Sequence, residues 1–348
     1  MIFRRLLYIP YYFVKTDWKL FFKYCRYVKV EKGLSYFTII GEVMRTMYKH
    51  NASPLDYFHL RFFDLSEEER SEFPCTGFMY EYQLKMNPIQ EREVLHDKIR
   101  FLERFDDFSG RKWATFTRLK TDREFAVEFC KRAGKKLVLK KSKGGAGKDV
   151  DVIEIPAGAP ESVTSIMEKE GYDLAEHYVI QHNEMMRLSP AAVNTIRIVT
   201  QYTEEGEVVI LLAFVRISVN SQVDNLSVGH YGVNIGAAID LATGRICQPG
   251  RYLDVTKTEV QVHPVTGTPI EGFTIPFWPA CKEIVINAAK LLPGNRSIGW
   301  DVAISNNGPV LIEGNHNWNL LSMAVGRKGY KKLFMQYMHR NVTEEVGI

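Results

Sequence analysis

Apolar residues follow a helical spacing in the first part of the chain and a mixed spacing after it. Between residues 1 and 48, aromatic and aliphatic residues recur every three or four positions, as in Leu20, Phe21, Tyr24 and Val28. This pattern predicts helices. From about residue 96, short apolar runs bounded by turn residues alternate with helical stretches, which is typical of an α+β fold.

The segment 96–187 predicts a small α+β lobe. Helical spacing covers 97–105, 121–133 and 161–171, and strand-like runs cover 136–141, 149–155 and 177–182. A glycine-rich turn separates the first two of these strands.

The segment 188–348 is richer in strands and predicts a larger lobe. Strands are expected over 195–202, 208–218, 298–305 and 309–313, with a helix over 278–292 and a last helix from about residue 320. We therefore expect three parts: a helical, aromatic and basic lobe over 1–95, the small lobe over 96–187, and the larger lobe over 188–348.

The chain is nearly balanced in charge, with 45 Lys and Arg against 41 Asp and Glu. Such a balance argues against a nucleic-acid partner, which would favour a strongly basic domain. The charge is uneven along the chain, because residues 1–30 hold seven bases and one acid. Two interpretations stay open for this tip: a helical lobe with solvated bases, or an amphipathic surface that rests on an anionic membrane.

The cysteines and the first apolar run bear on the cellular setting. Five cysteines lie far apart without a C-x-x-C pair, which argues against a disulfide framework or a structural zinc site. The uncharged run 6–14 is shorter than the roughly 20 residues that span a bilayer. Bulky and charged residues follow it, so we expect it to be retained rather than cleaved. A cytoplasmic protein, with or without peripheral contact at the inner face of the membrane, is the expectation.

A strand that ends at Lys140 runs into a turn rich in glycine and lysine over 141–148. Free backbone N–H groups and ammonium groups in such a turn suit a polyphosphate, and glycine allows the backbone to approach it closely. The turn matches neither a P-loop nor a Rossmann fingerprint. By itself it is compatible with phosphate binding or with an ordinary flexible hairpin.

The second constellation consists of Asp301, Glu313 and Asn315 on a predicted hairpin. The hairpin can place Asp301 opposite Glu313, and Glu313 and Asn315 share a face because they are two apart in a strand. Three oxygen donors of this kind suit Mg²⁺ bound to nucleotide phosphates. The alternative is that the two acids only cap the ends of the strands.

Together these features resemble the ATP-grasp superfamily. In its pattern, a lysine precedes a glycine-rich loop between two strands, and far downstream an Asp is followed, about a dozen residues later, by Glu-x-Asn. Further segments are similar to the sugar-transfer-associated ATP-grasp family, whose members tend to be linked with surface-polysaccharide genes. These segments are 194–200, 223–225, 239–244, 298–304 and 308–315. The resemblance covers about residues 95–335 and implies an ATP-grasp fold, in which two α+β lobes grip ATP.

The resemblance also implies roles for individual residues. Lys98, Lys140 and Lys143, with Gly144, Gly145 and Gly147 of the mobile loop, match groups that contact the phosphates of ATP. Ile180 and Gln181 lie where the hinge strand passes the adenine, and Glu184 is a candidate for the ribose. Asp301, Glu313 and Asn315 match the magnesium ligands.

Two arginines in predicted strands, Arg197 and Arg216, complete the expected catalytic set with Lys140. Many superfamily ligases keep an arginine two residues before the first metal aspartate, but this chain has Gly299 there. We therefore assign the phosphate-stabilising role to Arg197, because a guanidinium can bind phosphoryl oxygens in a bidentate manner. An ion pair with an acid such as Asp224 is the alternative for Arg197. Candidate substrate contacts are Asp224, Asn225, His230 and His316.

The expected activity is that of an ATP-dependent carboxylate–amine ligase that forms a C–N bond through an acyl phosphate and releases ADP and phosphate. The acceptor would be a small or glycan-linked carboxylate in surface-polysaccharide or sugar-linked biosynthesis, and the nucleophile an amino acid or another amine. The first alternative is a kinase that phosphorylates a hydroxyl of a sugar-type acceptor, with Asp224 or His230 as base. The second is an ATP-binding scaffold for glycan assembly without catalysis.

Overall fold

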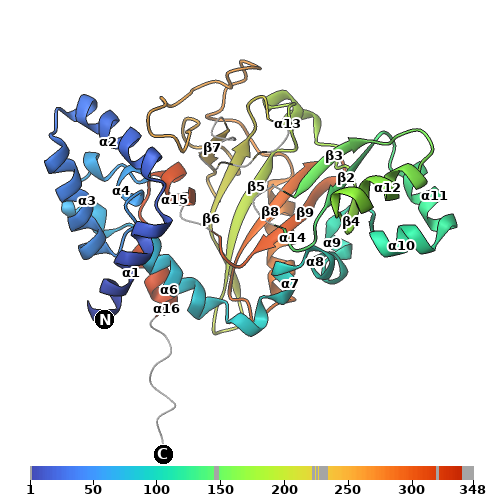
Figure 1. The fold of residues 1–348 in the computed structure, drawn as a ribbon, viewed down its shortest axis with the longest axis horizontal. Coiled ribbons are helices and arrows are strands. Elements are labelled where there is room, and N and C mark those ends of the chain that lie inside the picture. Colours follow the sequence, from blue (N-terminus) through green and yellow to red (C-terminus); the bar gives the residue numbers. More distant parts are fainter. Residues whose placement is uncertain are drawn as a thin grey trace, which may run out of the picture.

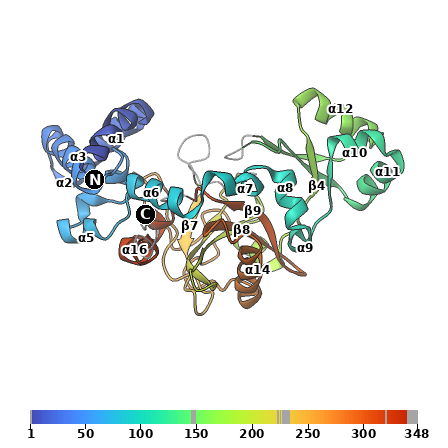
Figure 2. The same cartoon turned by 90° about the horizontal axis from the view of Figure 1, so that it is seen from below.

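The computed structural model describes residues 2–144, 149–221, 224, 226, 234–318 and 321–338. Its parts lie in a row, with a helical part at one end, a five-stranded sheet in the middle and a small α+β part at the other end (Figures 1 and 2). The architecture is mixed α+β with antiparallel sheets, as the sequence predicts.

The first part is helical, which confirms the expectation for residues 1–48. It contains α1 (Ile2–Lys15), α2 (Trp18–Lys32), α3 (Tyr36–His50), α4 (Asp56–His59), the 3₁₀ turn Phe62–Asp64, α5 (Glu67–Ser71) and α6 (Thr76–Met86). Asp17 caps α2 by accepting from the amide of Leu20, and Gly33 ends this helix with a φ of 66°. Helix α6 and the short α4 were not predicted, because their segments read as caps and turns.

The small lobe holds a four-stranded sheet in the order β1-β4-β2-β3. The strands are β1 (Trp113–Thr115), β2 (Lys136–Lys140), β3 (Val150–Glu154) and β4 (Leu174–His177). The 3₁₀ turn Ile89–Glu91 and α7 (Glu93–His96) lead into this lobe, whose helices are α8 (Lys98–Arg104), α9 (Asp106–Ser109), α10 (Phe116–Thr121), α11 (Arg123–Arg132) and α12 (Glu161–Glu170).

Two predictions for the small lobe are wrong in detail. The helix expected over 121–133 begins at Arg123, because the side chain of Asp122 caps it by accepting from the amide of Phe125. The strand expected over 177–182 is β4, which ends at His177, and beyond it only Gln181 makes an isolated bridge, to Ser305. The short strand β1 has only three residues and was not predicted.

The larger lobe is built on a sheet in the order β7-β6-β5-β8-β9. Its strands are β5 (Thr195–Tyr202), β6 (Val208–Ile217), β7 (Ile235–Ala238), β8 (Ser297–Ser305) and β9 (Gly308–Asn315). Four of these confirm the predicted strands, and the short β7 is an addition. The helices are α13 (Asn183–Leu188), α14 (Trp278–Lys290), α15 (Leu321–Gly326) and α16 (Lys331–Met338).

The helical part and the larger lobe share a hydrophobic core. Tyr82 of α6 lies against Trp318 and Phe334, and all three side chains are almost fully buried. Figure 1 shows α16 beside α6, at the junction between the two parts. The division of the chain at residues 95 and 187 therefore stays a prediction. Near these positions, α7 and α8 precede the first strand of the small sheet, and α13 precedes the first strand of the larger sheet.

Two further observations concern the expected setting. All five cysteines are free, and only Cys247 is exposed. Among the helices within the described ranges, none is both long enough and apolar enough to cross a membrane.

Candidate active site

The β8–β9 hairpin brings together three oxygen-bearing residues. Asp301 lies directly opposite Glu313 in the register, next to an irregularity in the pairing. The amide of Asn315 donates to a carboxylate oxygen of Glu313 at 3.0 Å. The hairpin geometry predicted from the sequence is therefore present.

Arginines from the two neighbouring strands converge on Asp301. Arg197 on β5 is paired with Asp301 across the sheet and donates to both of its carboxylate oxygens, with an Nη2–Oδ2 distance of 3.0 Å. Arg216 on β6 reaches the same two oxygens at 2.9 and 3.1 Å. The ion pair that was the alternative for Arg197 is therefore present, with Asp301 as its acid in place of Asp224.

The surroundings of Asp301 and Glu313 shift the pKa values of these two carboxyl groups in opposite directions. Burial alone would raise the pKa of Asp301, but the charges of Arg197 and Arg216 lower that pKa to about 2. For Glu313, burial and then the neighbouring Asp301 charge raise the pKa. The negative charge at Glu313 is therefore poorly compensated by the protein, as expected at a place that receives a cation.

Asp224 serves the protein's own structure. Its Oδ2 accepts from the amide of Thr195 at 2.7 Å and from the Thr195 hydroxyl at 2.5 Å. Its other oxygen lies 4.0 Å from Arg216. The neighbouring candidates Asn225 and His230 fall outside the described residues.

The space beside Gly299 explains how the sheet accommodates Arg197. A Cβ at position 299 would lie 3.0 Å from Cδ of Arg197 and 2.5 Å from Cβ of Trp318. The glycine therefore leaves room for the Arg197 side chain, which comes from the adjacent strand.

The lysines gather where the two lobes meet. Lys140, at the end of β2, is 92% buried and its Nζ lies 2.7 Å from Glu176 on β4. Lys98, at the start of α8, donates to the carbonyls of Lys141 and Gly144 at 3.0 and 2.5 Å. Lys143 is exposed, and Gly145 and Gly147 lie outside the described residues.

One cavity of about 250 Å³ collects the main candidates from both lobes. Its lining includes Lys98, Lys140, Gly144, Glu313, Asn315 and His316. Residues that are far apart in the sequence, and that were selected for phosphate or metal chemistry, thus face a common space.

Residues 78–335 match the profile of the sugar-transfer associated ATP-grasp family, which is well over half of the chain. The chain belongs to the sugar-transfer associated ATP-grasp family. The match begins in α6 and ends in α16, so it includes both sheets and the cavity between them. The segment before residue 78 is not part of the match.

Solved structures resemble this ATP-grasp protein only distantly. N5-carboxyaminoimidazole ribonucleotide synthetase from Thermotoga maritima is 14% identical, with a TM-score of 0.36, 65% of this chain covered and 43% of that chain. The L-amino acid ligase from Bacillus licheniformis is 13% identical, with a TM-score of 0.39, 66% of this chain covered and 42% of that chain. The D-alanine–D-alanine ligase from Bacillus anthracis is 11% identical, with a TM-score of 0.41, 75% of this chain covered and 74% of that chain. This chain spans less than half the length of the first two, and no curated protein matches its sequence significantly.

The cavity of this ATP-grasp protein suits a magnesium nucleotide. Carboxylate and amide oxygens of Glu313 and Asn315 are the donors that Mg²⁺ prefers, and Asp301 lies opposite Glu313. The ammonium groups of Lys98 and Lys140 line the same space and can neutralise phosphate oxygens. Within the described ranges, no group of three or more His, Cys, Asp and Glu residues forms a metal site of its own, so phosphate oxygens and water would have to complete the coordination of a metal ion.

The hinge candidates behave differently from the cavity residues. Ile180 is 74% exposed. The Gln181 side chain is buried, where its oxygen accepts from the amide of Asn194 and its nitrogen donates to the carbonyl of Ser189. Glu184 is exposed and pairs with Arg187 at 2.7 Å. The side chain of Gln181 therefore serves the fold, which differs from the expected contact with the adenine edge.

The sequence reasoning missed the acid that holds Lys140. Glu176 lies on β4, two residues along the register from the partner of Lys140, so the two side chains share one face of the sheet. Arg111 donates to Glu176 at 2.5 Å and to the carbonyl of Leu311 on β9 at 2.6 Å. The charges of Arg111 and Lys140 outweigh burial and lower the pKa of Glu176 to about 2. The sequence holds no local signal for this contact, because only the pairing of β2 with β4 in the folded sheet brings Glu176 to Lys140.

Proposed function

We propose that this protein is an ATP-dependent carboxylate–amine ligase that works through an acyl phosphate. The observation that carries the proposal is the shared cavity, in which Lys98 and Lys140 face Glu313 and Asn315 across the junction of the lobes. Membership of the sugar-transfer associated ATP-grasp family favours an acceptor from sugar-linked biosynthesis.

The proposed reaction has two steps whose atoms balance. A carboxylate oxygen attacks the γ-phosphorus of ATP, so that an acyl phosphate forms and ADP leaves. An amine then attacks the acyl carbon, so that an amide forms and phosphate leaves with loss of the amine proton. Phosphoryl transfer of this kind asks the protein mainly for positioning and charge neutralisation.

The residues in and beside the cavity can supply both. Glu313 and Asn315 line the cavity and would hold Mg²⁺, which neutralises charge on the phosphates when it is bound. Asp301 lies opposite Glu313, but both of its oxygens accept from Arg197 and Arg216. Lys98 and Lys140 would bind phosphate oxygens. Arg197 and Arg216 would hold Asp301 in its ionised form. Neither arginine lines the cavity, so Lys98 and Lys140 are the cations placed to stabilise the transferring phosphoryl group, in place of the role expected for Arg197.

A ligase is favoured over a sugar kinase by the state of Asp224. A kinase needs a general base near the acceptor hydroxyl. Asp224 is largely buried, its Oδ2 accepts two hydrogen bonds from Thr195, and its Oδ1 lies 4.0 Å from Arg216, so the protein's own groups hold this carboxylate. A scaffold without catalysis is disfavoured, because it has no physical need for the lysines, the carboxylates and the glycine-rich loop together.

The test is a hydroxylamine trap. The protein is incubated with Mg-ATP, hydroxylamine and a panel of uronic acids and amino acids, and ADP and hydroxamates are measured by mass spectrometry. A hydroxamate is expected, because hydroxylamine intercepts an acyl phosphate. ADP together with a phosphorylated acceptor and no hydroxamate would instead identify a kinase.

The matched variants are Glu313→Gln and Glu271→Gln, of which the second changes an exposed carboxylate away from the cavity. Glu313→Gln should lower ADP formation at least a hundredfold and leave the thermal unfolding midpoint near that of the wild type. Wild-type turnover in Glu313→Gln would refute the metal assignment.

A further inference from the structure

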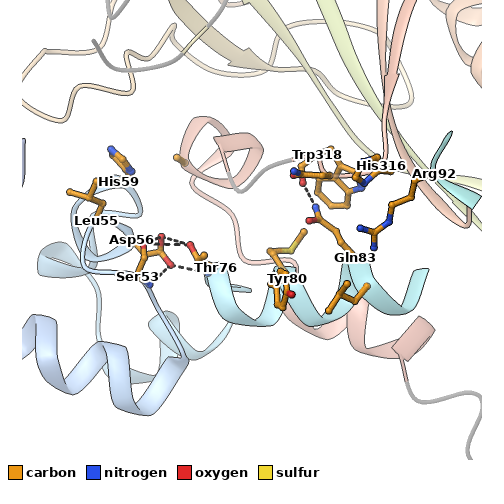
Figure 3. Close-up of a pocket in the computed structure, with 14 residues that line it drawn as sticks. Ser53, Leu55, Asp56, His59, Thr76, Tyr80, Gln83, Arg92, His316 and Trp318 are labelled. Carbon is orange, nitrogen blue, oxygen red and sulfur yellow. Dashed lines mark hydrogen bonds between the residues drawn. The ribbon is translucent and has the colours of Figure 1, made fainter. Parts of the chain in front are cut away.

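A second cavity, of about 450 Å³, lies between the helical part and the larger lobe. Figure 3 shows Arg92 and His316 at one end and Ser53, Asp56 and His59 at the other, with Tyr80 and Gln83 of α6 between them. A volume of this size is ordinary for a small-molecule site. The family match begins at residue 78, so much of this wall is specific to the helical part.

This cavity adjoins the one that holds the lysines. His316 and Asn317 line both of them. His96 lines only the lysine cavity, and its Nε2 lies 3.1 Å from Nε2 of His316. The imidazole rings of His96 and His316 therefore lie between the two cavities. His316 directly follows Asn315 in the sequence.

Several polar groups at this cavity have no partner within the described residues. The Nδ1 atom of His316, a side chain that is 92% buried, has no hydrogen-bond partner there, and the same is true of Nε2 of His59. The Nε atom of Arg92 donates to the carbonyl of Asn87 at 2.6 Å, whereas its Nη groups have no hydrogen-bond acceptor among the described residues. The two imidazole nitrogens are closed off from solvent, whereas Arg92 lines the cavity with its Nη groups unused, so the Arg92 guanidinium is the group here that can bind a ligand.

The two ends of the cavity differ in charge. The guanidinium of Arg92 lies at the end next to the lysine cavity, where it suits a carboxylate. At the far end, the Asp56 carboxylate accepts four hydrogen bonds from the amides and hydroxyls of Ser53 and Thr76. The hydroxyl oxygens of Ser53 and Thr76, which line the cavity, can still accept from hydroxyl groups of a ligand, and the negative charge of Asp56 would repel a second carboxylate.

The walls between these ends are apolar and aromatic. Leu55, Met79, Leu84 and Ala324 line the cavity, together with the half-exposed ring of Tyr80. A hydroxylated ring presents apolar C–H faces and polar edges, and it fits such a mixed lining.

We propose that this second cavity binds the carboxylate substrate and that the substrate is a hydroxylated ring acid of the sugar-acid class. Arg92 orients its carboxylate toward the lysine cavity, and the Ser53–Asp56 end accepts its hydroxyl groups. This assignment rests on the proposed ligase function.

The test measures binding directly, so it does not depend on turnover. D-glucuronate is titrated into the protein loaded with Mg-ADP and followed by calorimetry or saturation-transfer NMR. D-glucose is the control ligand that lacks the carboxylate, and cyclohexanecarboxylate is the control ligand that lacks the hydroxyl groups. Glucuronate should bind at least tenfold more tightly than either control ligand.

Four variants locate the bound acid. Arg92→Ala and Leu84→Trp should each weaken glucuronate binding at least tenfold, the first by removing the cation and the second by filling the cavity. Arg92→Lys should recover part of the loss, since it keeps the charge. Arg123→Ala, which removes an arginine with an 82% exposed side chain in the small lobe, should bind like the wild type.

The outcomes separate this proposal from the ligase proposal. Unchanged glucuronate binding in Arg92→Ala and Leu84→Trp would overturn the site, and no glucuronate binding by the wild type, or equal binding of cyclohexanecarboxylate, would overturn the substrate class. Failure of the wild type to bind Mg-ATP would overturn the ligase function instead. Affinity for Mg-ATP should be the same in all four variants.

A second, independent observation concerns the corner between α1 and α2. Phe13, Trp18 and Phe22 are 42, 36 and 53% exposed, and their rings form a row with centroid separations of 5.3 and 6.3 Å. Figure 2 places this end of the molecule far from the small lobe.

The two helices that carry these rings also carry exposed bases. Lys15, Lys19, Arg26 and Lys29 are exposed, and within the part of the chain that the structure describes none of them has an acidic partner within 4.0 Å. Exposed aromatic rings beside unpaired bases complement an interface of anionic headgroups and acyl chains. We infer that this corner rests on an anionic membrane surface.

Co-sedimentation with vesicles tests this inference. The wild type should bind vesicles of phosphatidylserine and phosphatidylcholine and should bind pure phosphatidylcholine vesicles at least fivefold less. The double variant Trp18→Ser/Phe22→Ser should lose at least fivefold in binding, whereas Val127→Ser on α11, also an exposed apolar position, should not. Equal binding of the double variant and the wild type would overturn the inference.

Discussion

Buried charges of the candidate active site form two small networks, and each consists of one carboxylate between two cations. Glu176 lies between Lys140 and Arg111, and Asp301 lies between Arg197 and Arg216. Taking charges out of water is costly unless they are paired, so each network depends on all of its members. The arrangement keeps both carboxylates ionised and leaves the Lys140 ammonium at the edge of the cavity.

Removal of the Lys140 ammonium should weaken nucleotide binding more than it weakens the fold. Lys140→Met should raise the Kd for Mg-ATP at least tenfold, which is about 1.4 kcal/mol. Glu176 keeps Arg111 as partner, so the protein should still fold. Isothermal titration calorimetry measures the affinity, with Lys136→Met at the exposed start of the same strand as the control. Equal affinities in Lys140→Met and the wild type would remove Lys140 from the site.

The low pKa of Glu176 predicts a loss of stability in acid. The folded pKa of about 2 lies below the ordinary 4.5, so this group stabilises the fold above about pH 4.5 and loses that effect as the pH falls toward 2. Between pH 6 and pH 3 the wild type should lose about 2 kcal/mol more than Glu176→Gln. Urea unfolding at several pH values measures this difference, and parallel pH dependences of the two proteins would contradict the assignment.

At the scale of elements, the central strands of the larger sheet bring the charges together. β5, β6 and β8 each contribute one member of the Asp301 network, and β9 contributes Glu313 and Asn315. Antiparallel pairing sets which residues face each other, so the hairpin determines the metal candidates and the neighbouring strands supply the arginines.

Substitution of Gly299 tests how tightly these strands are packed. In Gly299→Ala the new Cβ would lie 2.5 Å from Trp318 and 3.0 Å from Arg197, so we expect a loss of about 1–3 kcal/mol in the free energy of unfolding. Displacement of Arg197 should also reduce turnover. Chemical denaturation and an ATPase assay measure the two effects.

Gly41→Ala on α3 is the control, because a Cβ there meets nothing within 4 Å. Alanine favours a helix more than glycine does, by up to about 1 kcal/mol. Gly41→Ala should therefore be as stable as the wild type or more stable. If Gly299→Ala is as stable against unfolding as Gly41→Ala, the sheet has room for a Cβ at position 299.

At the scale of the whole molecule, the candidate active site lies at the junction of two lobes that pack directly on each other, with α8 against β9 and Phe105 against Trp300. Arg111 is a further link between them, because it binds Glu176 of the small lobe and the backbone of β9 in the larger lobe. A ligand that fills the cavity would add contacts to both sides.

Mg-ATP should therefore protect both lobes at once. In hydrogen–deuterium exchange, saturating Mg-ATP should slow exchange at least threefold over 136–144 and over 308–315, while 18–50 in the helical part should not respond. Glu313→Gln should lose the effect on 308–315. Protection confined to one lobe would contradict a nucleotide site shared by the two.

The sequence by itself determined the order of most elements and the chemistry of the site. Periodicity and turn residues predicted α2 and α3, β5, and the β8–β9 hairpin, because these elements follow from local spacing. The same local spacing placed Glu313 and Asn315 on one face and Asp301 opposite them. The resemblance to the ATP-grasp family also came from the sequence, because each of its motifs is local even though the motifs lie far apart along the chain.

Tertiary structure alone decided which distant groups meet. Nothing local pairs Arg197 with Asp301, joins Glu176 to Lys140, or engages the Gln181 amide inside the larger lobe, because these contacts depend on strand order and on the packing between lobes. The same holds for the second cavity. Its walls come from the helical part and from the segment after Asn315, which only the folded chain brings face to face.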